Sequence, residues 1–386
     1  MESFRRIYWP AINLIGSGAV QEIGTEVKNL GLKKILVVTD KVLRSLGVVK
    51  KVTDVLDAAS VSYVIFDDVK PNPTTKNVND GLIVFKANGC DSLLSIGGGS
   101  PQDAAKAIGI LNANGGDIVN YEGIGKSKYK SVPIIAVNTT AGTASEVTVN
   151  YVITDKARKT KMVMVDPNSL ATVAVNDPEL MVEKPAGLTA ATGMDALTHA
   201  IEAYVTKGAF GLSDALAIES VRLIGQSLET AVNDGKNIEA RSKMAWASYI
   251  AGLSFSNCGL GIVHSMAHQL GSEYDLPHGV ANAILLPFVE EFNSSVCPEK
   301  FRDIAIALGK NVDGLSVEEA RKVAIDAIKE LSKKVKIPAL KDTSFNPADV
   351  EKLAKQAMND VCTGGNPREV SVEDLKLIYL KAYQMT

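Results

Sequence analysis

The first half of the chain alternates short apolar runs with segments in which apolar residues recur at helical spacing. Continuous apolar runs are typical of parallel strands buried on both faces, and the intervening helices cover those faces. The strand-like runs lie at 35–38, 63–66, 92–96, 133–137, 162–165 and 172–175, and the helix-like segments at 48–59, 78–87 and 101–112. This pattern predicts an α/β domain built on a parallel sheet.

The pattern changes from about Leu188 onward, where long helical periods replace the apolar runs. The preceding segment, Glu183–Gly187, contains a proline and a glycine, which interrupt regular structure. We therefore expect two domains: an α/β domain over residues 1–187 and an all-helical domain over residues 188–386. The expected helices of the second domain lie at 188–206, 213–233, 238–254, 317–335, 347–361 and 372–382.

Composition excludes several classes of protein. The chain has 386 residues, a charged fraction of 22% and a formal net charge of −3. A nucleic-acid-binding surface is not expected, because phosphates require concentrated Lys and Arg. No apolar run reaches the roughly 18–20 residues that span a bilayer, and the first residues lack the apolar core of a signal peptide. The four cysteines are widely separated, as expected for reduced thiols in a cytoplasmic protein: Cys90, Cys258, Cys297 and Cys362.

A glycine-rich stretch, residues 97–103 (GGGSPQD), joins a predicted strand to a predicted helix. Glycines let backbone amides approach a ligand, and the amides at a helix start attract phosphate. We expect Ser100 to cap this helix and Asp103 to complete a capping box. The alternative is a plain strand-to-helix turn, since the stretch is neither GxGxxG nor a Walker A loop.

Two further polar positions follow predicted strands. The stretch 138–145 (NTTAGTAS) follows the run at 133–137, and Asp40 follows the run at 35–38. Ligands of open parallel sheets collect beyond the carboxyl ends of the strands. Asp40 either accepts hydrogen bonds from a ribose 2′-hydroxyl, and so repels a 2′-phosphate, or only caps the next helix.

The histidines point to a single chemical site in the second half of the chain. All four lie between residues 199 and 278. Asp195 and His199 are four residues apart, as are His264 and His268, which on a helix places each pair on one face. His278 lies in a predicted turn, within Leu-Pro-His-Gly. Imidazoles and a carboxylate together suit a divalent transition metal.

Spacing leaves two points about this site open. It does not decide whether His264 or His268 is a ligand, nor whether the metal is zinc or iron. A single histidine is more often a packed core or surface residue than a ligand, but here every histidine falls in one region. The motif HExxH is absent from the sequence, which disfavours a metalloprotease of that kind.

These motifs together resemble the iron-dependent, or group III, alcohol dehydrogenases over nearly the whole chain. The stretches that carry the resemblance are 71–74 (PNPT), 97–103 (GGGSPQD), 139–143 (TTAGT), 188–199 (LTAATGMDALTH), 264–270 (HSMAHQL) and 276–279 (LPHG). Within the family, Gln102 and the stretches 150–155, 211–215, 255–257 and 360–369 resemble the branch that interconverts lactaldehyde and 1,2-propanediol.

The resemblance implies a Rossmann-like NAD(P) domain followed by a helical domain, with catalysis between them and an assembly of at least two chains. It implies Fe²⁺, with Zn²⁺ as the alternative, bound by Asp195, His199, His264 and His278. His268 matches a histidine that is not a ligand and that helps proton transfer. Asn150 and Phe255 match positions near the reacting carbonyl, where Phe255 would limit substrate size. The matching cofactor positions are Asp40, Asn72, Gly98, Gly99, Ser100, Asp103, Thr139, Thr140, Lys161 and Leu180.

The expected activity is reversible hydride transfer between NAD(H) and a small primary alcohol or aldehyde, lactaldehyde and 1,2-propanediol above all. Other family substrates are the alternatives: 1,3-propanediol, butanol, ethanol or methanol. We also expect the run Ile12–Ile15 to be an edge strand that pairs across a dimer.

Two other classes of protein fit part of the pattern. A lyase resembling dehydroquinate synthase also uses NAD and a metal, but its sugar acid phosphate requires several basic residues. Here the stretches around the candidate ligands are small and apolar instead, at Ala190, Ala191, Ala196, Ala200 and Ala267. A catalytically silent metal-binding protein is disfavoured by the full set of cofactor positions.

Overall fold

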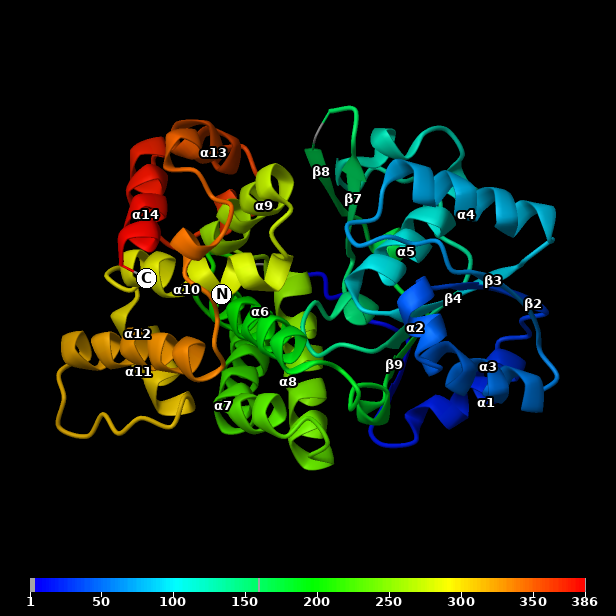
Figure 1. The fold of residues 1–386 in the computed structure, drawn as a ribbon, viewed down its shortest axis with the longest axis horizontal. Coiled ribbons are helices and arrows are strands. Elements are labelled where there is room, and N and C mark those ends of the chain that lie inside the picture. The colour runs from blue at the N-terminus through cyan, green and yellow to red at the C-terminus, as the bar shows by residue number, and fades with distance from the viewer. Residues whose placement is uncertain (1–3, 159, 386) are drawn as a thin grey trace. The chain divides into compact units, whose positions relative to one another are not determined.

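The computed structural model describes residues 4–158 and 160–385, which divide into two compact units, Met1–Val182 and Glu183–Thr386. The first unit runs from blue to green in Figure 1 and the second from green to red. The division falls at the start of the proline- and glycine-containing segment, a few residues before the boundary expected after Gly187. The α/β fold of the first unit and the helical fold of the second confirm the predicted fold class.

The first unit is built on a six-stranded sheet with the order β1-β9-β6-β4-β2-β3, in which every pairing is parallel. Its strands are β1 (Ile12–Ile15), β2 (Lys34–Val38), β3 (Ser62–Phe66), β4 (Ser92–Gly97), β6 (Ile134–Asn138) and β9 (Val173–Asn176). β1 pairs only with β9 and so forms one edge of the sheet, as expected for that run.

Helices cover both faces of this sheet, as the continuous apolar runs predict. Successive side chains of β2 enter opposite cores: Leu36 lies in one hydrophobic cluster and Ile35 in the other. Figure 1 shows α4 and α5 on one side of the sheet and α1 and α3 on the other. The helices of this unit are α1 (Ile23–Asn29), α2 (Lys41–Ser45), α3 (Val48–Ala58), α4 (Thr75–Ala87) and α5 (Gly99–Asn114).

A small second sheet was not foreseen from the sequence. It has the order β5-β8-β7, and the pairing of β7 with β8 is antiparallel. Its strands are β5 (Gly123–Ile124), β7 (Asn150–Asp155) and β8 (Thr160–Val165). The apolar run at 162–165 is therefore a strand, but it does not join the parallel sheet.

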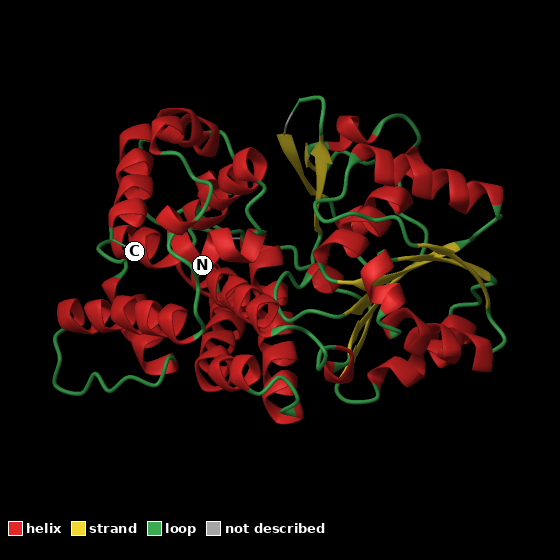
Figure 2. Ribbon diagram, in the orientation of Figure 1, coloured by secondary structure: helices red, strands yellow, loops and turns green. Residues whose placement is uncertain are grey.

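The second unit consists of helices; among the described residues, the strands, yellow in Figure 2, all belong to the first unit. α6 is buried on nearly all sides from Thr189 onward, which is why its sequence is rich in alanine and lacks a solvent-exposed polar face. None of the helices in the described ranges is both long and apolar enough to cross a membrane. The helices are α6 (Ala186–Val205), α7 (Gly211–Asn233), α8 (Ile238–Cys258), α9 (Ile262–Tyr274), α10 (His278–Asn293), α11 (Pro298–Ala307), α12 (Val317–Lys334), α13 (Val350–Met358) and α14 (Val372–Gln384).

Candidate metal centre and cofactor-binding residues

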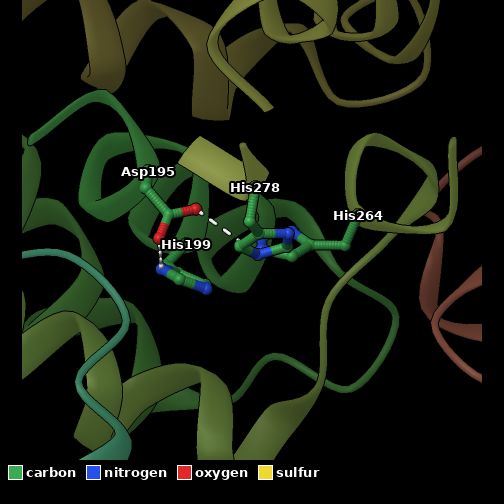
Figure 3. A group of neighbouring side chains, drawn as sticks. All are labelled: Asp195, His199, His264 and His278. Atoms are coloured by element: carbon green, nitrogen blue, oxygen red, sulfur yellow. Dashed lines mark ion pairs between the residues drawn. The ribbon is translucent and has the colours of Figure 1, made fainter. Parts of the chain in front are cut away.

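Three helices of the second unit bring four candidate ligands together. Asp195 and His199 lie one turn apart on α6, His264 lies on α9, and His278 is the first residue of α10. One ligand atom from each lies within 4.8 Å of all the others. Figure 3 shows the four side chains directed toward one another. His278 was expected in a turn; that expectation is wrong, because Pro277 precedes α10 as its N-cap.

The start of α10 reaches α6 because Gly279 has no side chain. A Cβ atom at Gly279 would lie 2.4 Å from the carbonyl oxygen of Ala191 and 3.3 Å from Cβ of Asp195. A larger residue would therefore push His278 away from Asp195. The motif Leu-Pro-His-Gly thus sets both the beginning of the helix and the position of one candidate ligand.

The donor atoms lie at or slightly beyond the spacing found around a bound divalent metal. Oδ1 of Asp195 lies 3.6 Å from Nε2 of His278, and Oδ2 of Asp195 lies 4.0 Å from Nδ1 of His199. A tetrahedral metal with ligands about 2.0–2.2 Å away separates the ligand atoms by roughly 3.3–3.6 Å. Asp195, His199 and His264 are almost fully buried. Burial and the neighbouring imidazoles hold the pKa of His264 far below its usual range, so its ring is neutral and can bind a metal.

The side-chain amide of Asn282 marks the point on which three of the donor atoms converge. Its nitrogen lies 2.7 Å from Oδ1 of Asp195 and 3.1 Å from Nε2 of both His264 and His278. An amide nitrogen carries two hydrogens, so it cannot satisfy three acceptors at once. A cation satisfies all of them, and we conclude that these residues fit the metal implied by the sequence.

His268 stands next to this group but outside it. Its Nδ1 lies 2.8 Å from Oδ2 of Asp360, and its ring stacks on that of His278 with 5.5 Å between the centroids. Burial opposes ionisation of Asp360, yet the charge and hydrogen bond of His268 lower the pKa of that carboxyl. His268, Asp360 and Cys362 form a second group of neighbouring donor atoms. The structure therefore groups His264, rather than His268, with the other three candidate ligands.

The ring of Phe255 packs directly against one of the candidate ligands. Phe255 lies on α8 and is 5% exposed. Its ring stacks on that of His199, with the centroids 4.3 Å apart and the planes inclined by 12°. Phe255 is thus both a core residue and a direct neighbour of a candidate ligand.

In the first unit, most of the predicted cofactor residues follow the carboxyl ends of neighbouring strands. Asp40 follows β2, Gly98 follows β4, Thr139 follows β6 and Leu180 follows β9. Because parallel strands end at the same edge of a sheet, these residues lie along one edge. The amide of Thr139 donates to the carbonyl of Gly97 over 3.1 Å, which ties two of these turns together.

Two capping predictions had different outcomes. Ser100 does not cap its helix: α5 begins at Gly99 with Gly98 as the N-cap and no side-chain cap. Asp103 instead accepts hydrogen bonds from Oγ of Ser145, at 2.8 Å, and from the amide of Val152, at 3.0 Å. Asp40 does cap α2, since its carboxylate accepts a 2.8 Å hydrogen bond from the amide of Leu43.

The remaining predicted residues of this unit lie on the small sheet or contact it. Nζ of Lys161, on β8, donates to Oδ1 of Asn72 over 2.9 Å, and Asn72 adopts a positive φ of 55°. Asn150 begins β7, and its carbonyl accepts a 2.7 Å hydrogen bond from the buried Lys106. Burial lowers the pKa of Lys106 to about 8 and raises that of Asp103 to about 6. This buried cluster could not be predicted from the sequence, because both residues lie within an ordinary helical pattern.

Sequence reasoning also missed three polar residues around the metal centre. Glu202 contacts His264, Asp360 contacts His268, and Asn282 contacts the ligands. Glu202 had a usable signal: it lies seven residues after Asp195 on a helix that is otherwise apolar, and so shares a face with it. Asp360 had none, because it is far from His268 in the sequence.

Comparison with known proteins identifies the class. The model of the family "Iron-containing alcohol dehydrogenase" matches residues 10–178, and that of "Fe-containing alcohol dehydrogenase family, C-terminal" matches residues 189–383. The chain therefore belongs to the iron-containing alcohol dehydrogenase family, and it is an oxidoreductase of alcohols and aldehydes.

Individual relatives differ in their named substrates. Lactaldehyde reductase of Escherichia coli K12 is 50% identical over 371 residues, covering 95% of this chain and 97% of the relative. The NAD-dependent methanol dehydrogenase of Bacillus methanolicus is 48% identical over 374 residues, covering 97% and 98%. A crystal structure of 1,3-propanediol oxidoreductase is 47% identical with a TM-score of 0.97, covering 98% of this chain and 100% of that one.

Proposed function

We propose that this protein catalyses the reversible, NAD(H)-linked interconversion of small primary alcohols or diols and aldehydes, with lactaldehyde and 1,2-propanediol as the preferred pair. The cluster of Asp195, His199, His264 and His278 is the observation that carries the proposal. The names of the relatives support the cofactor and the size of the substrate, since one is NAD-dependent and all act on short alcohols or aldehydes.

The four clustered residues would hold Fe²⁺, or Zn²⁺, which when bound supplies Lewis acidity toward the alcohol or carbonyl oxygen. NAD supplies the hydride chemistry, and the protein supplies position and charge. The amides of Gly98, Gly99 and Ser100, at the beginning of α5, suit the pyrophosphate. The same edge of the parallel sheet provides further cofactor contacts from Asp103, Thr139, Thr140 and Leu180. Asp40, at the end of β2, faces the adenosine ribose. Asn72, Lys161 and Asn150 contribute from beside the small sheet.

Oxidation releases one proton for each hydride transferred, and we assign its removal to His268. The contact of Nδ1 with Asp360 leaves Nε2 of His268 to accept that proton. Aldehyde reduction runs the same steps in reverse, with His268 as the donor. Asp360 acts by fixing the tautomer and orientation of the ring.

Two further statements about the protein complete the proposal. The exposed edge of β1 suits pairing with β1 of a second chain, which would make the protein a dimer. The widely separated cysteines, all free in the structure, suit a cytoplasmic location.

The decisive experiment measures NADH oxidation by the purified, metal-analysed protein with lactaldehyde, glycolaldehyde, butyraldehyde, 3-hydroxypropionaldehyde and formaldehyde. We expect the highest kcat/KM with lactaldehyde and no turnover after chelation of the metal. A higher kcat/KM with another aldehyde would overturn the substrate assignment. Release of phosphate from a sugar acid phosphate, without NADH oxidation, would instead indicate a lyase.

A further inference from the structure

A buried carboxylate, that of Glu202, lies directly behind the candidate metal centre. Glu202 lies on α6, three residues after His199 and seven after Asp195, so all three side chains share one face of the helix. It is 1% exposed. A carboxylate at such a position requires specific partners, because burying it without them is costly.

The hydrogen-bonding partners of Glu202 belong to the beginning of α9. One carboxylate oxygen contacts Nδ1 of His264, and the other accepts a 2.7 Å hydrogen bond from the amide of Val263. The N-cap of α9, Gly261, provides no side-chain cap, so Glu202 performs that task from another helix. A Cβ atom at Gly261 would lie 2.9 Å from the carboxylate oxygen, so glycine there permits the approach.

These contacts determine which ring nitrogen of His264 faces the metal centre. Nε2 of His264 points to the ligand cluster, where it lies 3.1 Å from the amide nitrogen of Asn282. A metal takes the lone pair of Nε2, so the ring proton must be on Nδ1, which then needs an acceptor. Glu202 supplies that acceptor.

We propose that Glu202 is a positioning residue of the metal centre: it holds His264 in the tautomer that presents Nε2 to the metal. The same carboxylate also fixes the beginning of α9. This inference rests on the proposed function, because it assumes that His264 is a ligand. Carboxylates that orient metal-bound histidines typically change metal affinity by about 10–100-fold when replaced.

Glutamine at position 202 separates the two tasks of the carboxylate. Its oxygen can still accept from the amide of Val263, so the helix start is retained. Its amide group then faces Nδ1 of His264 as a donor, which favours a proton on Nε2 and opposes metal binding. The substitution therefore alters the tautomer with little change in volume.

Glu290 provides a matched control in the same unit. It lies on α10, is fully buried, and accepts a 3.3 Å hydrogen bond from Nδ2 of Asn293. Burial raises the pKa of Glu290 to about 8, and burial together with the charge of Glu290 also raises the pKa of Glu202, so the two glutamates have similar environments. Glu290→Gln thus tests the effect of exchanging a neighbouring buried glutamate for its amide, without changing the group that faces Nδ1 of His264.

The experiment compares the wild type, Glu202→Gln, Glu290→Gln and His264→Ala by Co²⁺ affinity, with chelator competition on the full-length protein. The visible spectrum of bound Co²⁺ and the melting temperature of each metal-free variant are recorded as well. We expect Glu202→Gln to bind Co²⁺ about 10–100-fold more weakly and with an altered spectrum. Glu290→Gln should match the wild type, and the metal-free Glu202→Gln should melt close to Glu290→Gln.

The outcomes separate this inference from the proposed function. Unchanged Co²⁺ affinity and spectrum in Glu202→Gln, with loss in His264→Ala, would overturn the role of Glu202 and leave the metal site intact. Unchanged affinity in His264→Ala would overturn the metal site itself. Equal losses in Glu202→Gln and Glu290→Gln would show a general effect of buried glutamates, which also refutes the inference.

Discussion

Phe255 offers a direct test of how the protein limits its substrate. Its ring stacks on His199 at 4.3 Å, so Phe255→Ala should open apolar space beside the metal centre. Each additional substrate methylene that enters this space contributes about 0.8 kcal/mol, or about fourfold in kcat/KM. Two methylenes should therefore favour longer aldehydes by about 15-fold relative to lactaldehyde.

The same substitution should also destabilise the second unit, because Phe255 is only 5% exposed. Replacing a buried phenylalanine by alanine costs about 3–5 kcal/mol. Phe301→Ala is the matched control, since Phe301 is fully buried on α11, a helix that carries none of the candidate ligands. Phe255→Leu, a milder change, keeps the test valid if the alanine variant does not fold.

The assay is kcat/KM for propionaldehyde through hexanal, together with the melting temperature of each variant. Phe255→Ala should shift the preference toward longer chains, whereas Phe301→Ala should lower stability and leave the preference unchanged. A uniform loss across chain lengths in Phe255→Ala and Phe255→Leu, like that of the control, would show that Phe255 does not limit the length of the substrate.

Three further predictions concern single residues. His264→Ala should abolish metal binding and turnover, whereas His268→Ala should slow turnover with nearly full metal content; equal metal loss in both would show that the pair is misassigned. Asp360→Ala should slow turnover as His268→Ala does, and the double variant should be little slower than either, since both act in one step; additive losses in kcat would separate the two residues. Asp40→Gly should relax the preference for NAD over NADP by roughly 1–3 kcal/mol, while its loss as the cap of α2 costs only a few tenths of a kcal/mol. If the ratio of kcat/KM for NAD and NADP is unchanged in Asp40→Gly, Asp40 caps α2 and does not select the cofactor.

Hydrophobic periodicity in the sequence predicted the strands and helices that are buried on all sides. The runs of β2, β4 and β6 are apolar because both faces of the sheet are covered, and α6 is apolar because it is surrounded. β8 was misplaced because an apolar run does not reveal its partners, which here are the antiparallel β7 and the short β5. Ser100 was expected to cap a helix that in fact begins one residue earlier, at Gly99.

The sequence predicted the candidate metal ligands more fully than the residues that hydrogen-bond to the histidines of the site. His264 and His268 lie one turn apart on α9, so spacing in the sequence does not tell which of them is a ligand. Only the packing of α9 against its neighbours distinguishes them. His278 follows a proline that reads as a turn but precedes a helix. Glu202 and Asp360 act through contacts between helices, and such contacts have no local pattern in a single sequence.

The most direct test of the central claim is X-ray absorption spectroscopy at the metal edge of the active protein. We expect nitrogen and oxygen neighbours at about 2.0–2.2 Å from the metal, with the imidazole signature of His199, His264 and His278. His264→Ala should remove the metal. A sulfur neighbour at about 2.3 Å would instead place the metal with Cys362, His268 and Asp360, and would contradict the account.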